Sequence, residues 1–221
     1  MSIHEPPHNE LQRLYWRYLA DEQAADFVSE VGCLYTPATL ARMLETGDRV
    51  TRRGAALALG FLGDFSEANR PLGKALVDSD RAVRLMAETG IRWVWFRYGD
   101  TAERQTLSRI ARYNSEHRFG EVLELSEELL DHDPEIPEAW NQRAIAWFQI
   151  GRFEDSEGDC RRALELNPFH FLAAIGLGHC HLEFARIIPA IECFRRALTL
   201  CPDLEGVRAQ VEFLERSLGA S

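Results

Sequence analysis

The sequence has few of the features that mark membrane proteins, secreted proteins or disulfide-stabilised domains. No stretch of its 221 residues approaches the roughly 18 consecutive apolar residues that a membrane span requires. The segment Met1–Glu10 is polar and proline-bearing and has no apolar core like that of a secretory signal, so we expect a cytoplasmic protein. Its 5 cysteines are an odd, scattered set, which fits reduced thiols better than a disulfide framework.

The sequence also lacks the motifs of catalysis and cofactor binding. It contains no glycine-rich phosphate loop, no G-x-S-x-G, no H-E-x-x-H and no C-x-x-C. His179, Cys180 and His181 form one suggestive cluster, but successive helical residues project about 100° apart, so the two histidines cannot both face one metal ion. We therefore expect no catalytic residue, no metal and no cofactor, and a protein that is not an enzyme.

Positive charge is scarce overall and unevenly placed. The chain has 25 Lys+Arg against 35 Asp+Glu, a net charge of −10, which argues against nucleic-acid binding. Residues 37–112 hold 13 basic and 9 acidic side chains, whereas residues 113–221 hold 10 and 20. We expect the arginines of the first half to pair with carboxylates in a structural ladder. The acidic run over residues 121–133 either solvates a helix face or docks a basic partner or the positive half of another copy.

What the sequence does contain is a repeat of 34 residues. Residues 137–170 align with residues 171–204 and share R-R-A-L-x-L-x-P, and prolines recur at Pro134, Pro168 and Pro202. A period of 34 with paired helices resembles the tetratricopeptide repeat. The residues that match the family's positions are Trp140, Ala144, Trp147, Gly151, Phe153, Ala163 and Leu164 in one copy, and Leu177, Gly178, Ala190, Phe194, Ala197 and Leu198 in the next.

The resemblance implies an all-α fold, a right-handed α-α superhelix (solenoid). Three tetratricopeptide units would cover residues 101–204, the first of them degenerate, followed by a C-terminal capping helix over residues 205–221. In that cap we expect Val207, Val211, Phe213 and Leu214 to share the apolar side. Trp140 and Trp147 should be largely buried between helices.

A different repeat precedes these units. Residues 52–64 and 68–84 resemble the HEAT-like repeats of phycobilin lyases, and a pattern beginning at Leu40 recurs 32 residues later. HEAT-like helix pairs are therefore expected over residues 36–100, with Asp48 and Asp80 as helix N-caps. Residues 1–35 would form an N-terminal cap with one amphipathic helix over residues 9–31. No linker separates the two arrays, so we expect a core that continues across residues 100–113. Trp93 and Trp95 lie two apart on one helix, so one of them should be exposed.

The resemblance also suggests a binding face. First helices of tetratricopeptide units line the concave side, which here implies the partner-binding residues Asn141, Ile145, Phe148, Ile175, His179 and Leu182. Family members that clamp acidic C-terminal peptides use lysines at such positions, and these are absent here. An apolar peptide or amphipathic helix is thus the expected ligand. The alternative is that the C-terminal cap or tight curvature covers these residues.

We expect a non-enzymatic scaffold or adaptor that binds a protein or peptide partner. The alternative is an accessory subunit of an enzyme, similar to the HEAT-like lyases, that holds a substrate protein or a chromophore. The oligomeric state is left open.

Overall fold

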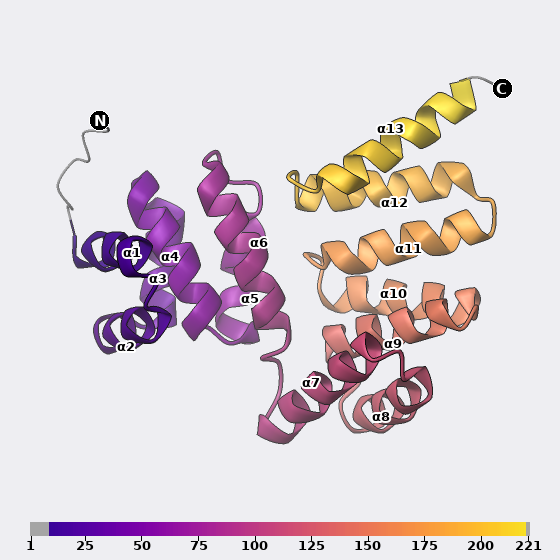
Figure 1. The fold of residues 1–221 in the computed structure, drawn as a ribbon, viewed down its shortest axis with the longest axis horizontal. Helices are drawn as coiled ribbons and strands as arrows, with labels where there is room; N and C mark the ends of the chain where they lie inside the picture. The colour runs from indigo at the N-terminus through magenta and orange to yellow at the C-terminus, as the bar shows by residue number, and fades with distance from the viewer. Residues whose placement is uncertain (1–8, 220–221) are drawn as a thin grey trace. The chain divides into compact units, whose positions relative to one another are not determined.

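The computed structural model describes residues 9–219, and over that range it contains α-helices and turns but no strand (Figure 1). The all-helical class predicted from the sequence is confirmed. The chain divides into two compact units, Met1–Val94 and Trp95–Ser221. The expectation of no secretory signal rests on Met1–Glu10. Residues 1–8 of that segment lie outside the described residues.

Helices α1 to α6 carry the first unit, and the last residue of α6 already belongs to the second. Their bounds are α1 Glu10–Asp21, α2 Ala24–Leu34, α3 Pro37–Thr46, α4 Arg49–Leu62, α5 Phe65–Ala75 and α6 Arg81–Trp95. The single helix expected over residues 9–31 is wrong, because two helices occupy that segment. Glu22 adopts a left-handed conformation with φ 55° and donates its N–H to the carbonyl of Tyr18, which ends α1.

Asp48 and Asp80 cap the N-termini of α4 and α6, as expected. The Asp48 carboxylate accepts the N–H of Thr51 at 2.8 Å, and that of Asp80 accepts the N–H of Val83 at 3.2 Å. Asp80 is also bound in bidentate fashion by Arg53, at 2.9 and 2.7 Å. This pair joins α4 to the start of α6, and it confirms for Arg53 the predicted structural role of an arginine paired with a carboxylate.

Helices α7 to α13 form the second unit. Their bounds are α7 Thr101–Ser115, α8 Phe119–His132, α9 Pro137–Gln149, α10 Phe153–Leu166, α11 Phe171–Glu183, α12 Ile187–Leu200 and α13 Glu205–Gly219. Small residues let successive helices approach closely. A Cβ at Gly178 would lie 2.6 Å from Cε1 of Phe194, so only glycine fits where α11 crosses α12.

The 34-residue period also appears in the backbone. His117, Gly151 and Ala185 each follow a first helix and adopt left-handed φ values of 58°, 80° and 54°. The next residues, Arg118 and Arg152, donate their N–H groups to the carbonyls of Tyr113 and Trp147, each at 2.9 Å, and Arg186 repeats the bond. Each first helix therefore ends in the same closed turn.

Four tryptophans test the burial predictions. Trp93 is 44% exposed and Trp95 only 1%, so the prediction that one of the pair is exposed is confirmed. Trp140 and Trp147 are partly buried, and Trp140 packs against the core clusters on both sides of it, so neither side chain is fully enclosed. The guanidinium groups of Arg143 and Arg152 lie over their rings and cover one face of each.

The terminal helix α13 packs onto the second unit through one side. Val207, Val211 and Leu214 are buried against a cluster that includes Phe194 of α12. Phe213 is 62% exposed, so its predicted place on the apolar packing side is wrong.

Candidate partner-binding face

The predicted partner-binding residues lie on α9 and α11, the first helices of two successive repeats. Ile145 of α9 is 39% exposed. Phe148 and His179 are half-buried and come together, with ring centroids 6.3 Å apart and planes at 61°. Phe148 also contacts Phe153 at 5.2 Å, and His179 contacts Phe194 at 5.2 Å. The structure thus brings Phe148 and His179 into one aromatic cluster, next to an exposed isoleucine on the same helix as Phe148.

Phe213 belongs to the same surface pattern by its repeat position. It follows His179 by 34 residues, just as His179 follows Ile145 by 34. It is 62% exposed, so it stays accessible like Ile145 at the same repeat position. The 34-residue spacing predicts that Phe213 shares the repeat position of Ile145 and His179. This pattern was missed because the last helix was treated only as an amphipathic cap. We call Ile145, Phe148, His179 and Phe213 the apolar row.

Ile175 and Leu182 are less accessible than the apolar row. Both are half-buried and pack against the cluster of α12 and α13 that contains Ile191 and Val211. Ile175 also packs against the neighbouring cluster that contains Leu177. The alternative left open by the sequence, that the last helices cover such residues, therefore applies in part to these two.

Asn141 does not lie on an accessible surface. It is 3% exposed, and its Nδ2 donates to Oε1 of Glu138 at 3.2 Å. The same oxygen accepts the Nε2 hydrogen of Gln142 at 2.6 Å, and Glu138 is 1% exposed. A buried carboxylate requires hydrogen-bond donors. Asn141 is one of the donors to Glu138, so its side chain is turned into the interior. The expectation that Asn141 contacts a partner is therefore not supported by its position.

The second oxygen of Glu138 is satisfied by His170. Oε2 lies 2.9 Å from Nε2 of His170, while Nδ1 of His170 accepts the N–H of Ala173 at 3.1 Å at the start of α11. Because Nδ1 is an acceptor, we assign the ring hydrogen to Nε2, which donates to the carboxylate.

Trp95 closes this buried network. Its ring stacks on that of His170 at 4.0 Å and 16° and lies 5.3 Å from the ring of Phe171. Sequence patterns did not identify this group, because the contact between Trp95 and His170 joins residues far apart in the chain. The one local signal was the polar His170 placed three residues before Ala173, a spacing typical of a helix N-cap.

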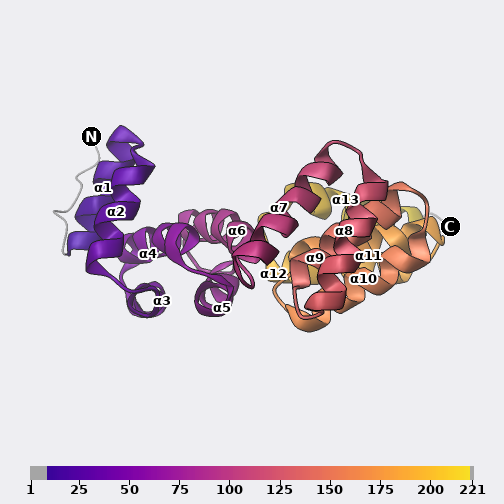
Figure 2. The ribbon, with the colours of Figure 1, turned by 90° about the horizontal axis from the view of Figure 1, so that it is seen from below.

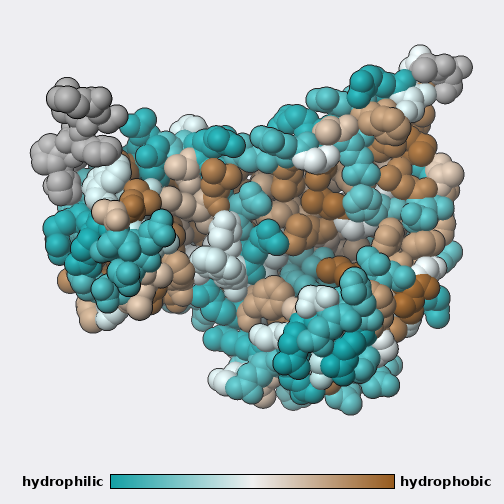
Figure 3. All heavy atoms as spheres, in the orientation of Figure 1, coloured by the Kyte–Doolittle hydropathy of each residue, from teal (hydrophilic) through white to brown (hydrophobic). Residues whose placement is uncertain are grey.

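The apolar row is close to electrically neutral. Burial lowers the pKa of His179, against the opposing effect of Glu183, so the imidazole is uncharged at neutral pH. The one lysine of the sequence, Lys74, belongs to the first unit. Apolar side chains are exposed over α9 to α13 on the face drawn in Figure 3. Apolar contact, rather than capture of a carboxylate by lysine, is what this surface offers.

No group of three or more His, Cys, Asp or Glu side chains among residues 9–219 is placed to hold a metal ion. Over the same residues, no helix has both the length and the apolar character that crossing a membrane requires.

Comparisons with known proteins identify the repeat. Residues 137–170 match the family model of the tetratricopeptide repeat. A TPR repeat-containing protein of Rhizobium etli is 24% identical over 144 residues, which cover 65% of this chain and 70% of that protein. The small glutamine-rich tetratricopeptide repeat-containing protein 2 of Mycosarcoma maydis is 23% identical over 103 residues, 47% of this chain and 29% of that protein.

Solved structures show the same fold. The first TPR domain of Spaghetti (RPAP3), bound to the HSP90 peptide SRMEEVD, superimposes with a TM-score of 0.51 at 21% identity and covers 53% of this chain and 93% of that chain. The Arabidopsis OM64 TPR domain gives a TM-score of 0.51 at 18% identity, covering 52% and 96%. Residues 137–170 are therefore a tetratricopeptide repeat, set in an all-helical chain whose fold is similar to that of tetratricopeptide domains.

Proposed function

We propose that this protein is a non-enzymatic interaction scaffold and that its second unit binds a segment of a partner protein along the apolar row. The observation that carries the proposal is the exposure of Ile145 and Phe213, 39% and 62%, at the same repeat position two periods apart, with His179 at that position in the repeat between them. Exposed large apolar side chains arranged in register are typical of interaction surfaces. Phe148 and His179 already form an aromatic contact with each other, and such preorganisation limits the entropy lost on binding.

The ligand we propose is an apolar peptide or the apolar side of an amphipathic helix. The RPAP3 domain is bound to a peptide in its solved structure, which supports a peptide-sized ligand here. Two features favour apolar anchors over capture of a terminal carboxylate. The second unit has no lysine, and Asn141 is committed to the buried Glu138. Ile175 and Leu182 are half-buried against the core, so they would provide less of the contact with the ligand than the apolar row.

We further propose that residues 36–100 are HEAT-like helix pairs and that the protein acts in the cytoplasm. The successive helices α3 to α6 support the first proposal, because Asp48 and Asp64 cap α4 and α5 and Arg53 ties α4 to Asp80 at the start of α6. A protein of two helical-repeat units would then combine two potential interaction surfaces in one chain.

A matched pair of substitutions tests the binding face. Ile145→Asp places a charge in the apolar row, whereas Ile188→Asp makes the same change at an isoleucine of α12 that is 63% exposed. Tagged wild-type and variant chains are used to capture proteins from the native lysate, and the captured polypeptides are quantified by mass spectrometry. We expect one polypeptide that wild type and Ile188→Asp retain and that Ile145→Asp loses by at least about tenfold, the effect of removing a hot spot.

Circular dichroism melting is the control for this test. Both isoleucines are exposed, so both variants should melt close to wild type. Ile175→Asp is avoided because Ile175 packs on two core clusters, and its loss would confuse binding with folding. Equal capture by Ile145→Asp and wild type would place the binding surface elsewhere.

A further inference from the structure

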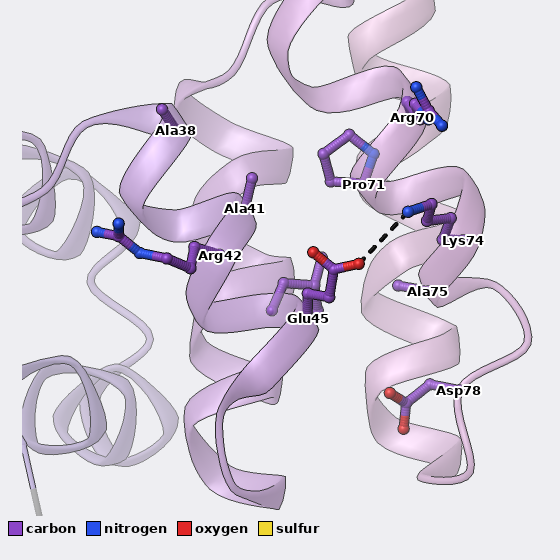
Figure 4. A pocket seen from close by; sticks show the side chains of 10 residues that line it. Ala38, Ala41, Arg42, Glu45, Arg70, Pro71, Lys74, Ala75 and Asp78 are labelled. Atoms are coloured by element: carbon purple, nitrogen blue, oxygen red, sulfur yellow. Dashed lines mark hydrogen bonds and ion pairs between the residues drawn. The ribbon is translucent and has the colours of Figure 1, made fainter.

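A hollow lies between α3 and α5 of the first unit, whereas the apolar row belongs to the second unit (Figure 4). The two helices lie side by side, and Figure 2 shows both nearly end-on. The facing positions hold Ala38 and Ala41 on α3 and Pro71 and Ala75 on α5. These short side chains leave a cavity of about 570 Å³ between the helices. An apolar side chain of another molecule can enter a hollow of this size.

The rim of the hollow carries unpaired positive charge. Arg42 of α3 and Arg70 of α5 extend outward from its two walls in Figure 4, and neither guanidinium has a hydrogen bond or ion pair with any residue from 9 to 219. Lys74 pairs with Glu45 across the gap at 3.4 Å, with both side chains more than half exposed, at 56% and 68%. A pair so exposed contributes at most about 1 kcal/mol, so a ligand carboxylate can replace it.

The remaining carboxylate of the rim is already neutralised. Asp78 accepts two hydrogen bonds from Arg52, at 2.8 and 2.9 Å, and both side chains are largely shielded from solvent. Its charge is thus balanced without help from the rim. Arg42, Arg70 and Lys74 therefore outweigh Glu45 around the hollow.

We propose that this hollow is a docking site for an acidic segment of a partner protein. One apolar side chain of the segment would fill the alanine-lined space, and its carboxylates would bind Arg42, Arg70 and Lys74. The apolar walls and the small number of cations favour such a segment over a nucleic-acid backbone, which needs an extended row of phosphate contacts. The site lies in the first unit and does not depend on the function proposed for the apolar row.

The experiment uses the full chain and a defined probe. The probe is a fluorescein-labelled, end-blocked helical peptide of Glu, Leu and Ala, and its control has Gln in place of every Glu. Binding is followed by fluorescence anisotropy at about 0.15 M salt, where charges more than about 8 Å apart are largely screened, for wild type, Arg42→Glu/Arg70→Glu and the matched pair Arg81→Glu/Arg92→Glu. Each variant replaces two arginines by glutamate, so the change in net charge is the same. Arg81 and Arg92 are exposed on α6 and lie outside the lining of the hollow.

We expect the acidic peptide to bind wild type and the α6 variant within about threefold of each other, because long-range charge alone has a small effect. The rim variant should bind at least tenfold more weakly, and the Gln peptide should bind weakly to all three. Ala38→Trp, which fills the hollow without changing charge, should also weaken binding. Ile145→Asp should leave it unchanged, which keeps this test separate from that of the apolar row.

Lys74 supplies a second readout, because it is the one lysine of the chain. Bound peptide should protect it from acetylation by an amine-selective reagent, with the terminal amine as internal reference. Equal weakening by the rim and α6 variants, or no protection of Lys74, would overturn the proposal. Tighter binding of duplex DNA or anionic vesicles at the rim would also overturn it, as would self-association abolished by the rim variant, which would make the occupant a second copy.

Discussion

At the scale of single residues, the turn after each first helix requires a left-handed conformation that only glycine adopts without strain. Gly151 meets this requirement with φ 80°, whereas Ala185 adopts φ 54° at the equivalent position. A left-handed conformation costs a non-glycine residue about 1–2 kcal/mol because its Cβ approaches the following carbonyl oxygen. Two of the three turns in the second unit therefore hold a residue that does not suit its backbone.

This difference predicts opposite effects for two exchanges. Gly151→Ala should lower the free energy of unfolding by about 1 kcal/mol, because the gain from a stiffer unfolded chain is smaller than the strain. Ala185→Gly should raise the free energy of unfolding by about 0.5–1 kcal/mol, because it removes the strain of the left-handed alanine and this gain exceeds the entropy cost of glycine. Urea denaturation followed by circular dichroism measures both. Outside residues 150–152, no heavy atom lies within 4 Å of the place that a Cβ would take at Gly151, so a clash with the rest of the protein cannot explain a loss there. A neutral Gly151→Ala would contradict the strain argument.

At the scale of helices, charged caps tie neighbouring elements of the first unit together. Asp80 begins α6 and binds Arg53 of α4, and its side chain is 9% exposed. The hydrogen bond from Arg53, opposed by burial and assisted by the N–H of Val83, lowers the pKa of Asp80 to about 2. Folding therefore favours the ionised carboxylate.

The sign of the pH dependence follows from this lowered pKa. The stabilisation is fully present above about pH 4, the ordinary range for Asp, and is lost as the pH falls through the folded value of about 2. Asp80→Asn keeps a good N-cap but removes the ion pair, so it should lower the free energy of unfolding by about 1–2 kcal/mol at pH 6. The gap between wild type and variant should close toward pH 2.

Denaturant unfolding at a series of pH values measures this gap. Asp100→Asn is the matched control, because Asp100 caps α7 through the N–H groups of Ala102 and Glu103 and no arginine binds its side chain. Its effect at pH 6 should be the smaller of the two. A gap for Asp80→Asn that stays constant from pH 6 to pH 2.5 would show that Arg53 does not act through the charge.

Helix-scale features were largely predictable from the sequence because their causes are local. The caps at Asp48 and Asp80 follow from side-chain chemistry, and the 34-residue period follows from the prolines and small residues that end and pack each unit. The break at Glu22 was not predictable, since no glycine or proline marks it. Glu22 itself is exposed, and the rings of Tyr18 and Phe27 on the two helices that it joins lie 5.3 Å apart.

At the scale of the whole chain, the candidate site was only partly predictable. Repeat position predicts that Ile145 is accessible, and its side chain is 39% exposed. Asn141 was expected on the same accessible face but is buried, and repeat position alone does not reveal why. Its burial depends on Glu138 and His170, which are covered by Trp95, and such a contact between distant segments leaves no periodic signal.

Trp95 also decides where the second unit begins. The repeat pattern places the start of the tetratricopeptide units at residue 101, whereas the compact unit of the structure begins at Trp95. Trp95 is 1% exposed and stacked on His170, so residues 95–100 should contribute to the stability of this unit. The two boundaries make different predictions for separately expressed fragments.

We expect residues 95–221 to fold alone and to be markedly more stable than residues 100–221, which keep the Asp100 cap but lack Trp95. Trp95→Ala within the longer fragment should lower its free energy of unfolding by about 3–5 kcal/mol, the usual cost of removing a buried tryptophan. Urea denaturation of the three proteins gives the comparison. If residues 95–221 and 100–221 unfolded at the same urea concentration, the stack on His170 would contribute nothing to this unit. The boundary expected from the repeat pattern would then be the physical one.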